Sequence, residues 1–389
     1  MHAFGPDAAR ALGAPAPDRR YAAAERAAEL PWPTPADEIW RYSRIDELSL
    51  EQFRPGRATT TVTGGDGVVA RGDELDHVPV AIDSPSPDVF AELNLAFTAE
   101  PILVRVPAGT VVPEPIVVTH HVAGDGTAAF PRLVIHAGAE SEVTIVERFT
   151  SDDDGAVLVV PVLQVLTGPA ARVRYLGVNE LAESAWQVGH QQAVGDRDST
   201  TLLATVALGG YYARVRTEAR LSGAGGSTRQ VALYFAGGEQ MHDFRTIQDH
   251  DAPHTTSDLL FKGALQDRSR SVYTGLIKVR PHAKGTTAYQ TNRNLTLGEG
   301  AWAESVPNLE IETNDVRCSH ASTVGPIDPE QRFYLESRGI PTSIAERLIV
   351  LGFFDEVLDQ LPVGPLATEL RSRVSNKLDL DRSLTGTVA

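Results

Sequence analysis

Residues 201–235 read TLLATVALGGYYARVRTEARLSGAGGSTRQVALYF. This stretch holds three β-rich runs, at 201–207, 213–221 and 230–235, which are separated by short connections rich in glycine. Similar runs recur from about residue 100 to residue 325, and no convincing helical pattern interrupts them. Many short strands at this spacing predict a sandwich, a barrel or a β-solenoid, and a helix-free span of this length favours the solenoid.

The two segments that flank the β-rich part differ from it in composition and in the spacing of their apolar residues. Residues 8–30 are rich in alanine, arginine and glutamate at helical spacing, whereas residues 54–75 read as a loose connection rich in glycine and threonine. After the β-rich part, Asp328 fits a helix N-cap and Gly339 fits a helix stop, and further helical spacing follows. Each rung of a solenoid packs on its neighbours and both ends need a cap, so we expect the helical flanks to supply the caps.

These patterns divide the chain into three predicted parts. We expect an N-terminal helical region with its connection over 1–75, a β-helix core over 76–325 and a C-terminal helical domain over 326–389.

Composition limits the possible functions. The formal net charge of -16 repels phosphate backbones, so nucleic acid is not expected as a partner. No apolar run is long enough to cross a membrane, and residues 1–7 do not resemble a signal peptide. A chain with one cysteine forms no internal disulfide. Together these features lead us to expect a cytoplasmic protein.

The one cysteine, Cys318, is followed two residues later by His320. The segment around them alternates apolar and polar residues like a strand, and residues two apart on a strand share a face. A nucleophilic pair is disfavoured because both groups lie on one strand. Iron and zinc accept both thiolate and imidazole, but a cluster normally takes about four thiolates. The pair is therefore either a structural, inert feature or an incomplete metal site.

Histidines and acids also crowd residues 241–254 (MHDFRTIQDHDAPH). Their spacing matches no metal-ligand pattern, and we expect stacked polar ladders on solenoid rungs. A β-helix enzyme that acts on acidic polysaccharide is the alternative interpretation of this stretch.

Several motifs resemble the SufB/SufD family of iron–sulfur cluster assembly proteins. They occur in the family's order, densely over 240–355, and are EIWRYS (38–43), HDAPHTTS (250–257), YQTNRNL (289–295), PNLEI (307–311), VRCSHASTVGPID (316–328) and FYLESRGI (333–340). Within the family the chain resembles the SufD branch. Ser319 and Ala321 stand where SufB carries glutamates, and Asn292 stands where SufB carries a cysteine implicated in cluster assembly.

The resemblance implies a mainly β fold, a right-handed parallel β-helix with helical termini. It implies a non-catalytic scaffold subunit of the SUF complex that forms a heterodimer with SufB, with a homodimer possible for the isolated chain. No cofactor is expected to bind stably to the chain alone. Instead, iron or an iron–sulfur cluster is expected to bind transiently at the SufB interface, with His320 and Cys318 as candidate ligands.

The resemblance also implies that the C-terminal helices bind SufC, an ABC-type ATPase. The sequence there carries a wide apolar stripe, for which packing against the body is the alternative. The residues expected to dock SufC are Phe333, Tyr334, Arg338, Ile344, Leu348, Leu351, Phe353 and Leu358.

Overall fold

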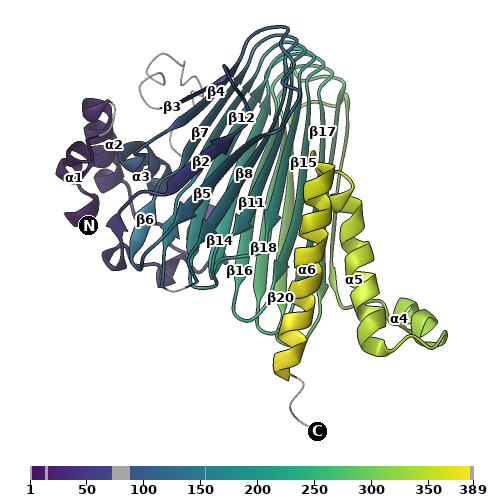
Figure 1. Cartoon of the computed structure of the whole chain (residues 1–389). Coiled ribbons are helices and arrows are strands. Elements are labelled where there is room, and N and C mark those ends of the chain that lie inside the picture. The colour runs from purple at the N-terminus through teal and green to yellow at the C-terminus, as the bar shows by residue number, and fades with distance from the viewer. Residues whose placement is uncertain (1, 14–15, 72–87, 154, 386–389) are drawn as a thin grey trace.

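The computed structural model describes residues 2–13, 16–71, 88–153 and 155–385 (Figure 1). Residues 72–87, which include the end of the predicted connection and the predicted start of the core, lie outside the described residues. Residues 386–389 of the predicted C-terminal domain also lie outside them.

The core is a β-solenoid built from two long sheets, as predicted (Figure 1). After β7 the chain alternates between the sheets, so most rungs contribute one strand to each, and the strands within each sheet are parallel. Sheet A has the path β3 (Val69–Arg71), β4 (Ile102–Val106), β7 (Arg132–Ala137), β10 (Val162–Thr167), β12 (Trp186–Gly195), β14 (Tyr212–Leu221), β16 (Met241–His250), β18 (Arg270–Val279) and β20 (Trp302–Ile311). Sheet B runs through β2 (Thr59–Thr63), β5 (Ile116–Val122), β8 (Glu142–Ser151), β11 (Arg172–Glu180), β13 (Thr200–Ala207), β15 (Ser227–Ala236), β17 (Thr256–Leu265), β19 (Thr286–Thr296) and β21 (Val316–Gly325).

The predicted connection over 54–75 was wrong in part, because its described residues form strands. β1 (Arg54–Pro55) pairs with β6 (Thr127–Ala129), β6 pairs with β9 (Leu158–Val159), and β9 pairs with β12, so the three strands form a side branch of sheet A. β2 and β3 pair antiparallel with β5 and β4, and so form the first strand of each sheet path. The threonines that suggested a loose linker alternate in burial along β2, as β-branched residues on a half-covered strand do.

The helical flanks lie on the outer faces of the sheets, and this corrects the expectation that they cap both ends. The N-terminal helices α1 (Pro6–Ala11), α2 (Pro17–Glu29) and α3 (Val89–Phe97) share an apolar cluster with the outer face of sheet A, including Phe130 and Trp186. The C-terminal helices α5 (Thr342–Leu358) and α6 (Gly364–Thr385) share one with the outer face of sheet B, including Leu233. The remaining helices are α4 (Pro329–Glu336), η1 (His2–Phe4), η2 (Glu38–Trp40), η3 (Ile45–Glu47) and η4 (Leu50–Gln52). None of the described helices combines the length and apolarity that crossing a membrane requires.

A buried ionic network holds the segment around Trp40 against sheet A. Arg214 and Arg245 donate to the carboxylate of Asp243, each at 2.7 Å, and all three side chains are buried. The same two arginines donate at 2.6 Å to backbone carbonyls of residues 39 and 41, and the Arg214 guanidinium lies over the Trp40 ring. Burial raises the pKa of Asp243, but the two guanidinium groups outweigh it, and the net pKa is lowered. The carboxylate is therefore charged and fully paired.

Candidate functional site

The last rung of the solenoid is the candidate site. Within the part of the chain that the structure describes, its strands β20 and β21 are the last on their sheet paths, and each pairs with one neighbouring strand, β18 and β19 respectively. Each of them is ten residues long. A strand of that length with an unpaired edge is a template for pairing with another chain.

The side chains of this last rung are less buried than those of the preceding rung. β18 and β19 alternate between buried and less buried residues, whereas β20 and β21 contain no buried residue. Leu309, Ile311 and Val324 are 40%, 39% and 43% exposed. They continue the side-chain columns of Ile277, Val279 and Asn294, which the preceding rung buries. The exposure arises because no further rung covers them, so the solenoid ends in an apolar surface, which we call the open end.

Cys318 and His320 lie on this open end. In the parallel register of β21 with β19 they stand beside Ala288 and Gln290, both of which are buried. Both side chains therefore continue columns that face the interior, and they share one face of the strand, as the sequence spacing predicts. Cys318 is half-buried against Ile277 and Ala288, whereas His320 is exposed.

The thiol of Cys318 is held in its neutral form. Partial burial raises its pKa above the ordinary value, and a backbone hydrogen bond with Ala288 lowers it by less. Among the described residues, no group of three or more His, Cys, Asp or Glu side chains is arranged to hold a metal ion. Thiolate and imidazole are donors that iron accepts, so the donor types of the pair fit iron while their number leaves the shell incomplete.

The His/Asp-rich stretch 241–254 forms paired ladders, as the sequence analysis expected. His242 and His250 are buried, and burial lowers their pKa to about 3 and about 4, so both are neutral at pH 7. Asp249 accepts from Arg280 of the next rung at 2.8 Å, and Asp251 pairs with Arg220. These carboxylates neutralise arginines on neighbouring strands, so they are not arranged as a pair of catalytic acids.

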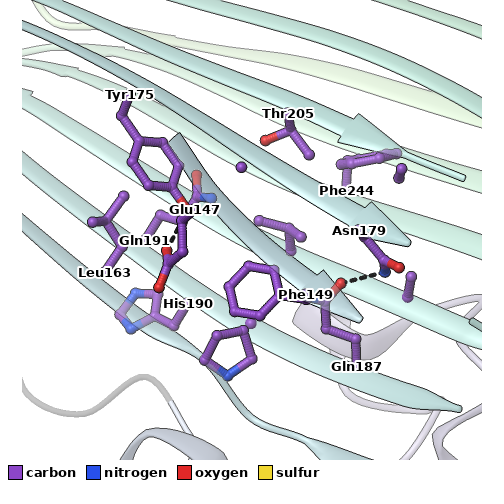
Figure 2. A pocket seen from close by; sticks show the side chains of 16 residues that line it. Glu147, Phe149, Leu163, Tyr175, Asn179, Gln187, His190, Gln191, Thr205 and Phe244 are labelled. Carbon is purple, nitrogen blue, oxygen red and sulfur yellow. Dashed lines mark hydrogen bonds between the residues drawn. The ribbon is translucent and has the colours of Figure 1, made fainter. Parts of the chain in front are cut away.

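Sequence reasoning missed a small cavity inside the solenoid, whose surface is mostly apolar (Figure 2). This water-sized space of about 20 Å³ has Gly177 and Gly189 among its lining residues, and the Tyr175 hydroxyl and the Pro161 ring lie close to where their side chains would be. Figure 2 shows Tyr175 pointing at Glu147; the Tyr175 hydroxyl donates to that carboxylate at 2.6 Å, and His120 lies 3.0 Å from it on another side. Glycines at interior strand positions were the available signal, but the partners come from strands far apart in sequence. The cavity can hold one ordered water.

The residues predicted to dock SufC divide into two groups in the structure. Phe333, Tyr334, Ile344 and Leu348 are 69%, 56%, 44% and 47% exposed, and Figure 1 shows α4 projecting away from the sheets. The Arg338 guanidinium lies over the Tyr334 ring at 4.4 Å.

Leu351 and Phe353 are half-buried, and Leu358 is 2% exposed within the cluster that α5 shares with sheet B. Leu358 therefore belongs to the core and is a correction to the predicted docking set. Helix α5 carries apolar residues on several faces, so periodicity alone did not distinguish the packed face, with Val350 and Phe354, from the exposed one.

The fold and the open end define a β-solenoid with an apolar, unpaired last rung that carries a thiol and an imidazole on one face. Residues 120–353 match the family model described as "SUF system FeS cluster assembly, SufBD core domain". The chain therefore belongs to the SufBD family of the SUF iron–sulfur cluster assembly system.

Individual relatives agree with this assignment. An iron–sulfur cluster assembly SufBD family protein of Mycobacterium tuberculosis is 34% identical, and the alignment covers 89% of each chain. The iron–sulfur cluster assembly protein SufD of Escherichia coli is 29% identical, also over 89% of each chain. SufD of Bacillus subtilis is 31% identical over 70% of this chain and 63% of its own length.

We predict that Cys318 alkylates slowly in the folded chain at neutral pH. Because burial favours the neutral thiol, the rate of reaction with iodoacetamide should rise with pH around an apparent pKa above that of an ordinary thiol. Cys318 is the one cysteine, so no other thiol contributes. The same chain in urea is the control and should titrate at the ordinary thiol value. A folded chain that titrates at or below that value contradicts the buried, neutral thiol.

Proposed function

We propose that this chain is a non-catalytic scaffold subunit of the SUF assembly complex. It pairs with SufB through the open end, binds the SufC ATPase through its C-terminal helices, and supplies His320 and Cys318 to a site that receives iron or a nascent cluster. The observation that carries the proposal is the unpaired last rung with two ligand side chains on its exposed inner face. A free thiol in this role suits a reducing compartment, so we also propose that the protein is cytoplasmic.

Pairing with SufB is supported by two properties of the open end. The edges of β20 and β21 have unsatisfied backbone donors and acceptors, and the interior face there exposes Leu309, Ile311 and Val324. A partner that adds strands satisfies the backbone groups, and one that also ends in a solenoid rung covers the apolar side chains. SufB belongs to the same family model and is therefore expected to present a matching rung. Pairing of two copies of this chain would use the same surface.

Sharing of ligands follows from the composition of the pair. A thiolate and an imidazole leave at least two positions of a tetrahedral site open, and the described residues of this chain supply no third ligand nearby. In the proposed complex SufB completes the shell, and the iron or cluster is the cargo of the assembly reaction. Because the pair lies on a rung that the partner covers, binding of cargo depends on the state of the interface.

Docking of SufC is supported by the exposed side chains of α4 and α5. Four large apolar residues stand clear of the body on two consecutive helices, next to the positively charged Arg338. The opposite side of α5 is fixed to sheet B through Val350 and Phe354, and Lys262 pairs with Glu356. A force applied by an ATPase to these helices would therefore reach the outer face of sheet B, whose last strand β21 carries Cys318 and His320.

The pairing surface is tested by Leu309→Asp. Because the substitution puts a charge on an apolar surface that a partner would desolvate, we expect SufB recovered in a pull-down of the co-expressed complex to fall about tenfold or more. The matched control is Val111→Asp, which changes an exposed valine far from the open end, on the connection between β4 and β5. Undiminished recovery of SufB with Leu309→Asp rules out the open end as the pairing surface.

The ligand role is tested by His320→Ala in the co-expressed complex with SufB and SufC. The complex should stay intact, because His320 is exposed and lies outside every described apolar cluster, while its iron and acid-labile sulfide content should fall at least several-fold. His282→Ala, which removes another exposed histidine in the turn between β18 and β19, is the control. Equal iron content in the His320→Ala and wild-type complexes would contradict the ligand role of His320 and favour a purely structural role for Cys318 and His320.

SufC docking is tested by the double substitution Ile344→Asp and Leu348→Asp. Both side chains are exposed, so the fold should be retained, and the amount of SufC that co-purifies should drop about tenfold or more. Phe354→Ala is the contrasting variant, because it removes a buried ring and should lower the thermal midpoint of the chain. If the double variant retains SufC in full, the docking surface lies elsewhere.

A further inference from the structure

Gln290 is a buried polar residue that the preceding account does not use. It lies on β19 directly beside His320 of β21 in the parallel register. Its side chain is 1% exposed, and within the described structure neither its amide oxygen nor its amide nitrogen has a hydrogen-bond partner. Buried polar atoms are nearly always paired, so an amide with both atoms unpaired indicates a partner that approaches it in a further state of the molecule.

The amide group has a defined place in the interior. A Cβ atom added to Gly275 would lie 2.6 Å from each of the two amide atoms, so the head of Gln290 lies against Gly275 of the opposite sheet. Gly275 is in turn the register partner of Pro307 on β20. Pro307 and His320 lie on the last rung, on opposite sheets. The amide of Gln290 therefore lies one rung earlier, in the interior between the two sheets.

Stacked parallel strands place this amide and the imidazole in one side-chain column, and the described structure has no hydrogen bond between them. Neighbouring strands are about 4.8 Å apart, and side chains in one column point the same way, which is how glutamine and asparagine ladders form hydrogen bonds along a stack. His320 has no rung above it, so the open end lies on one side of its ring and Gln290 on the other.

We propose that Gln290 is a positioning residue for His320. Its amide oxygen accepts the hydrogen of one imidazole nitrogen, which fixes the tautomer and turns the other nitrogen toward the open end and the cargo. Histidines that bind metals commonly donate their second N–H group to a fixed acceptor in this way. An amide does this without adding charge to the site. The inference rests on the role of His320 in the proposed function.

The chain contains a matched control residue. Gln230 lies in the same interior column, two rungs behind Gln290 with Leu259 between them. It is also 1% exposed and also has both amide atoms unpaired. Substituting Gln230 removes a chemically identical buried amide without altering the neighbour of His320.

The primary test reads the tautomer of His320 in the co-expressed complex with SufB and SufC, the state in which the Gln290 amide is expected to gain its partner. Two-bond ¹⁵N–¹H correlation spectra of the histidine rings are recorded, and the His320 signal is identified by its loss in His320→Gln. We expect a single tautomer in wild type and Gln230→Leu, and averaging of the two tautomers in Gln290→Leu. Gln290→Glu retains an acceptor and should retain the single tautomer. An averaged His320 ring in wild type, or an unchanged one in Gln290→Leu, overturns the proposal.

A second measurement connects the tautomer to cargo binding. In the co-expressed complex, Gln290→Leu should lower the affinity for added Fe²⁺ about tenfold, whereas Gln230→Leu should not. If Gln290→Leu does not fold, as judged by circular dichroism, Gln290→Glu and wild type still decide the tautomer. If His320→Ala leaves Fe²⁺ binding unchanged, the ligand role of His320 is overturned, and the tautomer measurement still decides the role of Gln290.

Discussion

The structure depends on one constraint: every rung of a parallel solenoid is completed by the next. Between the first strands, β3 and β2, and the last strands, β20 and β21, each strand on the two sheet paths pairs on both edges, and the neighbouring rung covers its interior side chains. At β20 and β21 the interior side-chain columns continue, but no further described rung covers them. Side-chain burial therefore falls from one rung to the next, as between β19 and β21. The apolar open end and the exposed position of His320 are both consequences of stopping the stack without a cap.

The helices do not relieve this constraint, because they are used elsewhere. Both helical regions cover the outer faces of the sheets, where alternate strand residues would otherwise expose large apolar areas. On sheet A the buried network around Asp243 fixes the segment that carries Trp40, and the ring of the neighbouring Tyr42 lies 6.1 Å from that of Trp302 on β20. The helices thus cover the outer faces of both sheets and leave the last rung uncovered.

The interior changes character along the stack, and this bears on the site. The first rungs are filled by aliphatic residues such as Val165 and Val173, whereas the last rungs hold amides, hydroxyls and neutral histidines, including Gln230 and Gln290. Each buried side-chain amide near the open end that lacks a hydrogen-bond partner lowers the free energy of unfolding. The polar interior also places hydrogen-bond acceptors such as Gln290 directly behind His320 at the open end. The small cavity near Glu147 lies farther back, among rungs that are otherwise filled.

The sequence alone determined the solenoid, the helical flanks and the shared face of Cys318 and His320, because these follow from local periodicity and from the two-residue repeat of a strand. It did not determine that residues 54–71 contain three strands, that the helices cover the sheet faces instead of the ends, or that Leu358 is core while Leu348 is exposed. Those outcomes depend on which surface each element meets, and α5 has apolar residues on more than one face. The tertiary structure alone brought Gln290 beside His320, since register between strands about thirty residues apart is set by the stacking of whole rungs and not by any local pattern.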